Sequence, residues 1–235
     1  MNRLLANWRV VVRDVAVAAG IRARSPWRRL DPRPWLVGER EPVVLIPGVY
    51  ENWQFMLPLA RRLTDAGHPV HLLAELRWNT RPIPEQAAIV GRHLASRELR
   101  DAVLVGHSKG GLIGKHVLLH DDPGRRVARL VAVASPFAGS SYSRWMPSRA
   151  LREFQPTAPT VAALAAEARA NARITSVYPE WDAHIPEGSR LDGATNVEVP
   201  VRGHFRVLVE PVALDAVLAA VDGADPAAGP ARAAD

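Results

Sequence analysis

The sequence predicts an α/β domain, built on a mostly parallel central sheet of about six strands with helices on both faces. Short apolar segments alternate along the chain with segments that carry apolar residues at helical spacing. Most of these apolar segments lack a regular alternation with polar residues, which is typical of strands buried on both faces. The length of 235 residues and the hydrophobic content of 48% are enough for one such domain with a sizeable core.

Strands and helices alternate between residues 42 and 221. The strands are expected at Pro42–Ile46, Val70–Ala74, Ala102–Val105, Val127–Ala134, Ile174–Tyr178 and Val197–Val201. The helices are expected at Asn52–Ala66, Glu85–Leu99, Ser108–His120, Thr157–Ala170 and Pro211–Val221. Gly67 follows the first helix as a stop signal, and Pro84 precedes the second as a start signal. Right-handed crossovers place every strand-to-helix loop at the carboxyl edge of the sheet, where we expect the functional site.

The domain is predicted to cover residues 41–221, between an N-terminal arm and linker over residues 1–40 and a disordered tail over residues 222–235. Within the arm, residues 3–22 are expected to form an amphipathic helix. Its apolar stripe consists of Trp8, Val11, Val12, Val15 and Ala19. Residues 25–42 are rich in Pro and Trp, which is typical of a linker or wrapping segment.

Positive charge is concentrated in the arm. Residues 1–40 contain nine Arg and three acidic residues, and this excess equals the net charge of +6 of the whole chain. A near-neutral domain with a basic arm is not the pattern of a nucleic-acid-binding domain, so no nucleic-acid partner is expected. Arg9 and Arg13 lie on another face of this helix than the apolar stripe, and such a basic amphipathic arm fits peripheral contact with an anionic membrane through residues 3–22. The alternative is an arm that folds back on its own domain.

The composition also limits the compartment and the chemistry. The chain has no cysteine, which excludes disulfides, thiolate metal sites and a Cys nucleophile. Arg9, Arg13 and Asp14 interrupt what would be the apolar region of a secretory signal, and no apolar run approaches the roughly 20 residues of a membrane span. We therefore expect a cytoplasmic protein whose membrane contact, if any, is peripheral. The sequence does not indicate the oligomeric state.

The strongest motif is Gly106-His107-Ser108-Lys109-Gly110, which matches G-x-S-x-G between a predicted strand and a predicted helix. A nucleophile on such a turn has a strained backbone and projects its oxygen above the sheet edge. A side chain at either glycine would collide with the neighbouring strand or helix. The amides at the start of the helix favour negative charge developing beside the serine. Ser108 is therefore the candidate nucleophile.

A serine nucleophile needs a base, and the base needs a carboxylate that orients it. Asp182 follows the fifth predicted strand and His204 follows the sixth, so the order Ser, Asp, His is the one that this architecture uses. The other candidates for the acid are Glu180, Asp192 and Asp215. The other candidates for the base are His107, which we expect to pack under the turn, and His184. The remaining histidines are expected on the surface or in helices: His68, His71, His93, His116 and His120.

An oxyanion hole requires two backbone N–H donors. One is expected at Lys109, the residue after the nucleophile. Gly48 lets the loop IPGVYENW turn tightly after the first strand, so Val49 is expected to supply the other donor, with Tyr50 as the alternative.

These segments together resemble a known family. IPGVYENW, GHSKGG, ASPFAGS, YPEWDAHIP and VRGHF are similar to the ordered signatures of the α/β-hydrolase superfamily. Over roughly residues 41–221 the chain resembles the small bacterial lipases and esterases that lack a large cap. The resemblance implies the same nucleophile, acid, base and oxyanion amides, and it implies that SPFAGS lines the acyl pocket.

Tyr50, Phe137 and Trp145 are expected to bind the substrate, Phe137 because it belongs to the SPFAGS loop. The segment between Ser141 and Ile174 is too short for a large helical cap, and its apolar residues could either pack in the core or form a substrate wall.

Two positions depart from the family pattern. The usual His-Gly of the oxyanion loop is Pro47-Gly48, and Lys109 stands where Met, Gln or Leu is common in lipases. The Lys109 ammonium could favour an anionic substrate or could point to solvent.

The predicted function is hydrolysis of a small-molecule or lipid carboxylic ester through a Ser-His-Asp triad and an acyl-enzyme, without a metal or organic cofactor. A thioesterase or acyltransferase would use the same residues. A third possibility is a non-catalytic, membrane-associated protein that retains the fold.

Overall fold

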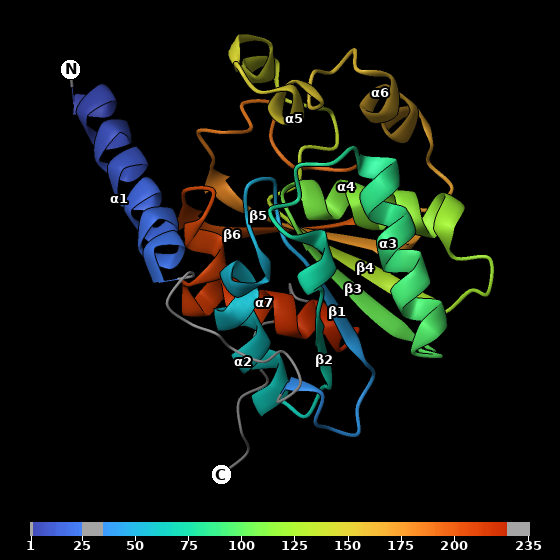
Figure 1. Cartoon of the computed structure of the whole chain (residues 1–235). Coiled ribbons are helices and arrows are strands. Elements are labelled where there is room, and N and C mark those ends of the chain that lie inside the picture. The colour runs from blue at the N-terminus through green and yellow to red at the C-terminus, as the bar shows by residue number, and fades with distance from the viewer. Residues whose placement is uncertain (1, 25–34, 225–235) are drawn as a thin grey trace.

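The computed structural model describes residues 2–24 and 35–224. Most of the predicted linker and all but the first residues of the predicted tail lie outside the described residues. The chain forms a six-stranded sheet in the order β2-β1-β3-β4-β5-β6 (Figure 1). The strands are β1 (Val43–Ile46), β2 (Val70–Leu72), β3 (Ala102–His107), β4 (Val127–Val133), β5 (Ile174–Trp181) and β6 (Thr195–Arg202). Every neighbouring pair is parallel, so the predicted α/β architecture with about six strands is confirmed.

Helices cover both faces of the sheet. On one face, α2 (Leu57–Asp65) and α7 (Pro211–Val221) pack on odd-numbered residues of β1 such as Val43 and Leu45. On the other face, α3 (Ile83–Ser96) and α4 (Lys109–His116) pack on the even-numbered residues Val44 and Ile46. Because successive side chains of a strand point to opposite faces, both sets must be apolar, which explains the unbroken apolar segments of the sequence.

Short helical turns connect these elements. They are η2 (Trp53–Met56), η3 (Ala74–Leu76), η4 (Val117–Asp121), η5 (Ser141–Trp145), η6 (Asn171–Arg173) and η7 (Arg206–Leu208). Between β4 and β5 the chain forms, besides η5 and η6, the short helices α5 (Arg149–Arg152) and α6 (Pro159–Ala166), and no large cap. The predicted helix over 157–170 is therefore shorter than expected.

The fifth strand is longer than predicted. It continues past Tyr178 to Trp181 and passes through Pro179. Proline cannot donate a ladder hydrogen bond, and for that reason the sequence favours a strand end there. However, β4 pairs with β5 only as far as Val177, and beyond that residue β5 pairs with β6 alone. The missing N–H of Pro179 is tolerated because this part of β5 has a neighbouring strand on one side only.

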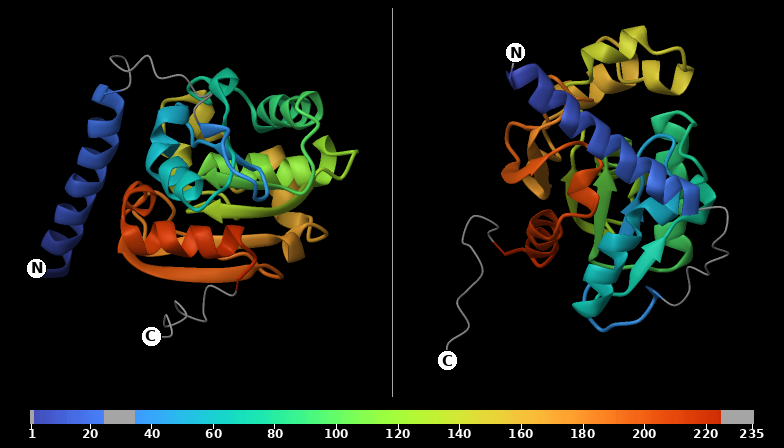
Figure 2. Two further views of the ribbon diagram at one scale, coloured as in Figure 1. Left: turned by 90° about the horizontal axis from the view of Figure 1, so that it is seen from below. Right: turned by 90° about the vertical axis from the view of Figure 1, so that its left-hand side faces the viewer.

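The N-terminal helix α1 (Asn2–Arg24) lies outside the two helical layers, along one side of the molecule (Figure 2). Its orientation differs from the one that the apolar stripe predicts. Trp8, Val12 and Val15 are exposed, whereas Asp14 is buried. The helix therefore packs on the domain through a face that includes a carboxylate, and most of its apolar stripe faces outward. None of the described helices has the length and apolar character that crossing a membrane requires.

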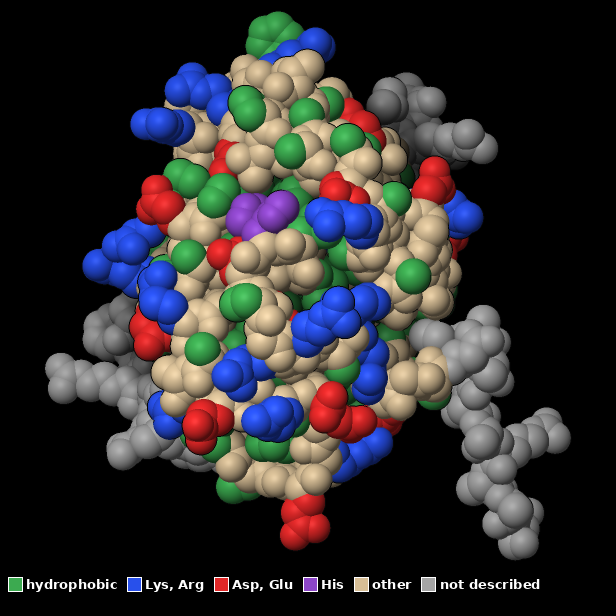
Figure 3. Space-filling view, turned by 90° about the vertical axis from the view of Figure 1, so that its right-hand side faces the viewer, with side chains coloured by type: hydrophobic (Ala, Val, Ile, Leu, Met, Phe, Trp, Pro, Cys, Tyr) green, Lys and Arg blue, Asp and Glu red, His purple; other side chains and the backbone are tan. Residues whose placement is uncertain are grey.

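Basic and acidic side chains are interspersed on the side of the molecule shown in Figure 3. That surface agrees with a domain whose charges balance outside the arm.

Close packing of α4 on β1 gives a prediction for stability. A Cβ atom at Gly110 would lie 2.1 Å from the carbonyl oxygen of Ile46. Because this neighbour is backbone, Gly110→Ala should destabilise the protein by roughly 3 kcal/mol. Thermal unfolding should show this as a Tm about 6–12 °C lower for a domain of this size.

Gly20→Ala in α1 is the matched control, because nothing lies within 4 Å of a Cβ at that position. Its stability should be unchanged or higher by up to about 1 kcal/mol. Equal Tm values for the Gly110 variant and the unmodified protein would contradict the packing argument.

Candidate active site

Ser108 lies on the sharp turn between β3 and α4. Its φ of 51° and ψ of −115° place a non-glycine residue in a strained region of backbone space. The Ser108 N–H donates to the carbonyl of Val133 at 2.8 Å, which anchors the turn to β4. A Cβ at Gly106 would lie 2.3 Å from the carbonyl carbon of Gly110, so the first glycine is required by the close approach of the helix. The local geometry is therefore the one that the G-x-S-x-G segment predicts.

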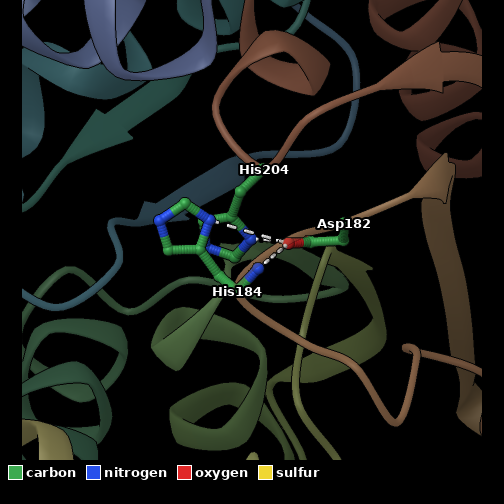
Figure 4. A group of neighbouring side chains, drawn as sticks. All are labelled: Asp182, His184 and His204. Carbon is green, nitrogen blue, oxygen red and sulfur yellow. Dashed lines mark hydrogen bonds and ion pairs between the residues drawn. The ribbon is translucent and has the colours of Figure 1, made fainter. Parts of the chain in front are cut away.

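Asp182 and His204 meet at the carboxyl edge of the sheet, after β5 and β6 respectively. His204 Nδ1 donates to Asp182 Oδ2 at 2.7 Å, and each of the two side chains is 6% exposed (Figure 4). His204 and Ser108 line the same cavity. The structure thus places the predicted acid in contact with the predicted base, and the predicted base on the wall of the cavity that the predicted nucleophile also lines.

Opposing effects set the pKa values of this pair. Burial alone would raise the pKa of Asp182, but the positive charge of His204 and hydrogen bonds from His204 and His184 lower the pKa to about 2. Burial also works to lower the pKa of His204, yet the negative charges of Asp182, Glu51 and Asp14 raise this pKa above its usual value. The site therefore contains an ionised carboxylate that stabilises the protonated form of its imidazole partner.

A second imidazole lies beside the first. The ring centroids of His184 and His204 are 4.8 Å apart, and the backbone N–H of His184 donates to Asp182 Oδ1 at 2.7 Å (Figure 4). Burial and the nearby charge of His204 lower the pKa of His184 to about 4. The ring is therefore neutral near pH 7 and forms part of the cavity wall.

The other candidates for the acid have contacts elsewhere. Glu180 lies within β5 with Oε1 3.6 Å from Arg202 Nε. Asp215 pairs with Arg62 at 2.8 Å. The carbonyl of Asp192 accepts a hydrogen bond from Asn171 at 2.8 Å.

His107 lies beneath the serine turn, as the sequence predicts, and there it joins two loops of the site. Its Nε2 donates to the carbonyl of His204 at 3.0 Å, and its Nδ1 lies 2.9 Å from Glu51 Oε1. Glu51 Oε2 in turn accepts the Gly48 N–H at 2.7 Å. The buried His107–Glu51 pair therefore links two loops. One is the base loop, defined as residues 203–206, and the other is the loop that follows β1, where the oxyanion hole is expected.

The two predicted oxyanion amides belong to this region. Val49 lines the cavity directly after Gly48. Lys109 is the first residue of α4, and the first N–H groups of a helix have no partner within it. Tyr50 adopts a φ of 59° and forms a hydrogen bond with the Ser148 hydroxyl, which ties the oxyanion loop to the start of α5.

Both interpretations of the Lys109 side chain were wrong. Lys109 is fully buried, with Nζ 2.9 Å from Glu153 Oε2 and donating to the carbonyls of Asn79 and Arg81. Burial lowers the pKa of Lys109, and Glu153 partly opposes this shift. The ammonium therefore neither meets solvent nor lines the substrate cavity; it ties the start of α4 to the segment that carries Phe154.

The cavity beside Ser108 has a volume of about 500 Å³ and a mostly apolar lining. It is lined by Val11, Val15, Val49, Tyr50, Glu51, Ser108, Pro136, Ser140, Tyr142, Ser143, Met146, Leu151, Phe154, Ala183, His184, Ile185, His204 and Phe205. Of the three predicted substrate contacts, Tyr50 lines this cavity. Phe137 is instead buried in the core on the α4 face, and Trp145 is 76% exposed outside the lining. The sequence gives the loop of each residue but not the direction of its side chain.

Two buried carboxylates of the site, Glu51 and Asp14, are not predicted from the sequence. Glu51 follows the oxyanion glycine by three residues, but nothing in the sequence shows that it faces His107. Asp14 reaches the His204 loop from α1, across 190 residues of sequence. One feature of the sequence sets Asp14 apart. It is the only acidic residue among the first 24, and it lies three residues after Val11, on the same side of the helix.

Asp182, His184 and His204 could offer three ligand atoms to a metal ion, since these atoms lie within 4.8 Å of one another in the described part of the chain. The contacts of Asp182 with both imidazoles already account for their closeness. We identify none of these residues as a metal ligand.

Comparison with solved structures shows that this architecture is the α/β-hydrolase fold. The lipase BlEst2 of Bacillus licheniformis in its mature form superposes with a TM-score of 0.60 at 14% identity, covering 83% of this chain and 94% of that one. Its propeptide form gives a TM-score of 0.62 at 14% identity over 81% of this chain and 51% of that one, so the chain spans about half the length of that form. A monoacylglycerol lipase of Paleococcus ferrophilus gives 0.58 at 17% identity, covering 80% and 95%.

No protein-family model matches the sequence, and no curated protein matches it either. At these identities the structural likeness shows the fold, whereas the chemistry depends on the residues of the site.

Proposed function

The chain has the α/β-hydrolase fold, and we propose that it is a serine hydrolase that cleaves carboxylic esters through an acyl-enzyme. The observation that supports this most is the buried hydrogen bond between His204 and Asp182, on the wall of the cavity that also holds Ser108. The lipases among the structural neighbours support the same class of reaction.

In the proposed mechanism, His204 Nε2 takes the proton of Ser108 as Oγ attacks the ester carbonyl. The N–H groups of Val49 and Lys109 hold the oxyanion of the tetrahedral intermediate. Asp182 keeps Nδ1 protonated and stabilises the imidazolium. His204 then protonates the departing alcohol, and water repeats the sequence to release the carboxylic acid.

The lining of the cavity supports an uncharged acyl group of short to medium length. Leu151, Phe154 and Ile185 present apolar surface, whereas the buried ammonium of Lys109 is neutralised by Glu153 and lies outside the lining. We therefore propose small-molecule or lipid esters with apolar acyl chains as substrates.

Steady-state kinetics test this function. Aryl esters of increasing acyl length should be turned over, with kcat/KM rising until the chain fills the cavity. A matched acyl thioester should be a poorer substrate. Faster cleavage of the thioester would favour a thioesterase or acyltransferase, and no turnover of either class by the folded protein would contradict the proposal.

The raised pKa of His204 predicts the pH dependence. The base acts in its neutral form, so kcat/KM should fall as the pH drops through the pKa of His204, which the neighbouring carboxylates raise above the usual value for histidine. A pH profile of kcat/KM with a soluble ester would measure this limb. Full activity maintained down to pH 5 would contradict the assignment of His204 as the base.

We further propose that the region around the cavity mouth contacts a lipid surface. The apolar rim, defined as Trp8, Val12, Val15, Tyr142, Trp145 and Met146, consists of exposed residues. Val15, Tyr142 and Met146 also line the cavity, so the rim is continuous with the place where an acyl chain would enter. Exposed Arg9 and Arg13 flank the rim on α1, which favours an anionic surface.

Sedimentation with lipid vesicles tests this contact. Binding to vesicles that contain phosphatidylglycerol should exceed binding to phosphatidylcholine alone and should weaken with salt. The double variant Trp8→Ser with Val12→Ser should lower vesicle affinity by about 10-fold or more, because less apolar area is buried. Val212→Ser, which removes an exposed apolar side chain from α7 outside the rim, is the control and should bind normally. Equal binding of both variants, or formation of a stable dimer through the rim, would contradict the proposal.

A further inference from the structure

The carboxylate of Asp14 is the contact that joins α1 to the base loop. Asp14 is 2% exposed. Its Oδ2 accepts the N–H of His204 at 2.9 Å, and its Oδ1 accepts the N–H groups of Phe205 at 2.8 Å and Arg206 at 3.0 Å. Three consecutive backbone N–H groups of the base loop thus donate to a single carboxylate, which lies on α1, before the first strand in the sequence.

The base loop is shaped to receive this carboxylate. Gly203, directly before the base, has a φ of 123°, and a Cβ there would lie 2.5 Å from Asp14 Oδ1. A side chain at this position would therefore displace Asp14. If Asp14 were removed, three N–H groups of a largely buried loop would lose their acceptor, and the loop would have to move to satisfy them.

We propose that Asp14 is a positioning residue for His204: through the amides of residues 204–206, α1 holds the imidazole in line with Asp182 and with the Ser108 hydroxyl. The inference rests on the proposed function, because it is the role of His204 as base that Asp14 serves. It makes α1 part of the catalytic unit, although α1 lies outside the layers of the fold.

Asp14 also acts on the charge of the base. The titratable groups that face His204 are Asp182 after β5, His184 in the following loop, His107 at the end of β3, Glu51 after β1 and Asp14 on α1. The carboxylates among them raise the pKa of His204, and Asp14 is one of these carboxylates. An uncharged residue that only pinned α1 to the domain would not change the titration of His204.

The experiment compares three full-length proteins: the unmodified chain, Asp14→Asn and Asn7→Ala. Asp14→Asn keeps the size of the side chain but replaces one acceptor oxygen with an NH₂ donor and removes the charge. We expect kcat to fall by about 10- to 100-fold with KM changed by less than about 3-fold, because an ill-placed base slows the chemical step more than it weakens binding. The acid limb of kcat/KM should move to lower pH, since the imidazolium loses one stabilising negative charge.

Asn7→Ala is the matched control. Asn7 Oδ1 accepts a hydrogen bond from Arg202 Nη2 at 2.8 Å, so this variant removes another contact between α1 and the domain without touching the base loop. Its kcat and its pH profile should equal those of the unmodified protein.

An NMR titration and a second variant complete the experiment. NMR titration of the His204 imidazole reports its pKa without reference to turnover, and this pKa should be lower in Asp14→Asn. If Asp14→Asn does not fold, Asp14→Glu takes its place. This variant retains the charge but displaces the acceptor oxygens, so its kcat should still fall at constant KM. An unchanged kcat in either folded variant would overturn the inference, and so would an unchanged His204 titration in Asp14→Asn. Absence of ester turnover by the unmodified protein would instead contradict the proposed function and leave the NMR comparison to decide the role of Asp14.

Discussion

Ser108→Ala should lower the turnover of a soluble ester by on the order of 10⁴-fold or more. The substitution removes the oxygen that is to form the acyl-enzyme, while the turn, its glycines and the cavity remain. The strain at Ser108 comes from its backbone, so the alanine variant should fold with a similar Tm. The measurement is kcat/KM with an aryl ester, together with far-UV circular dichroism to confirm the fold.

Ser143→Ala is the control for this variant. Ser143 also lines the cavity, but its hydroxyl donates to the carbonyl of Ser140 at 2.6 Å and has no role in the proposed reaction. Its activity should stay within about 3-fold of the unmodified protein, because one hydrogen bond contributes only about 1 kcal/mol. Turnover retained by Ser108→Ala would show that another group performs the reaction.

Asp182→Asn should have the second largest effect, a loss of about 10⁴-fold in kcat. The asparagine fits the same space but can present its NH₂ group to His204 Nδ1. The ring would then carry its proton on Nε2 and could not accept the proton of Ser108. The variant also loses the charge that stabilises the imidazolium, so KM should change far less than kcat.

Asp192→Asn is the matched control, since Asp192 is an alternative acid in the sequence but is placed elsewhere in the structure. Its kcat should not change. His184→Gln gives a second comparison within the site, because His184 also lies against Asp182. A larger loss in the His184 variant than in a His204 variant would reassign the base.

Much of the fold follows from local patterns in the sequence. Parallel strands buried on both faces leave apolar runs, and glycines and prolines mark the ends of helices. The turn at Ser108 is predictable for the same reason, since Gly106 and Gly110 stand where the chain approaches itself. The length of β5 was not predictable, because the tolerance of Pro179 depends on where the neighbouring strand ends.

The site was predictable where loop order alone brings residues together, as for Asp182 and His204. It was not predictable where the direction of a side chain decides. Lys109 turns away to Glu153, and Phe137 turns into the core. The helical periodicity of residues 3–22 gave the helix but the wrong packed face, because Asp14 is buried by hydrogen bonds to distant amides rather than by apolar contact.

Labelling with a fluorophosphonate tests the central claim most directly. The Ser108 oxygen should bond to the phosphorus with release of fluoride, and mass spectrometry should find one adduct per chain, on Ser108. Labelling should be absent in Ser108→Ala and strongly slowed in Asp182→Asn. A folded protein that remains unlabelled, or that is labelled at another residue, would contradict the account.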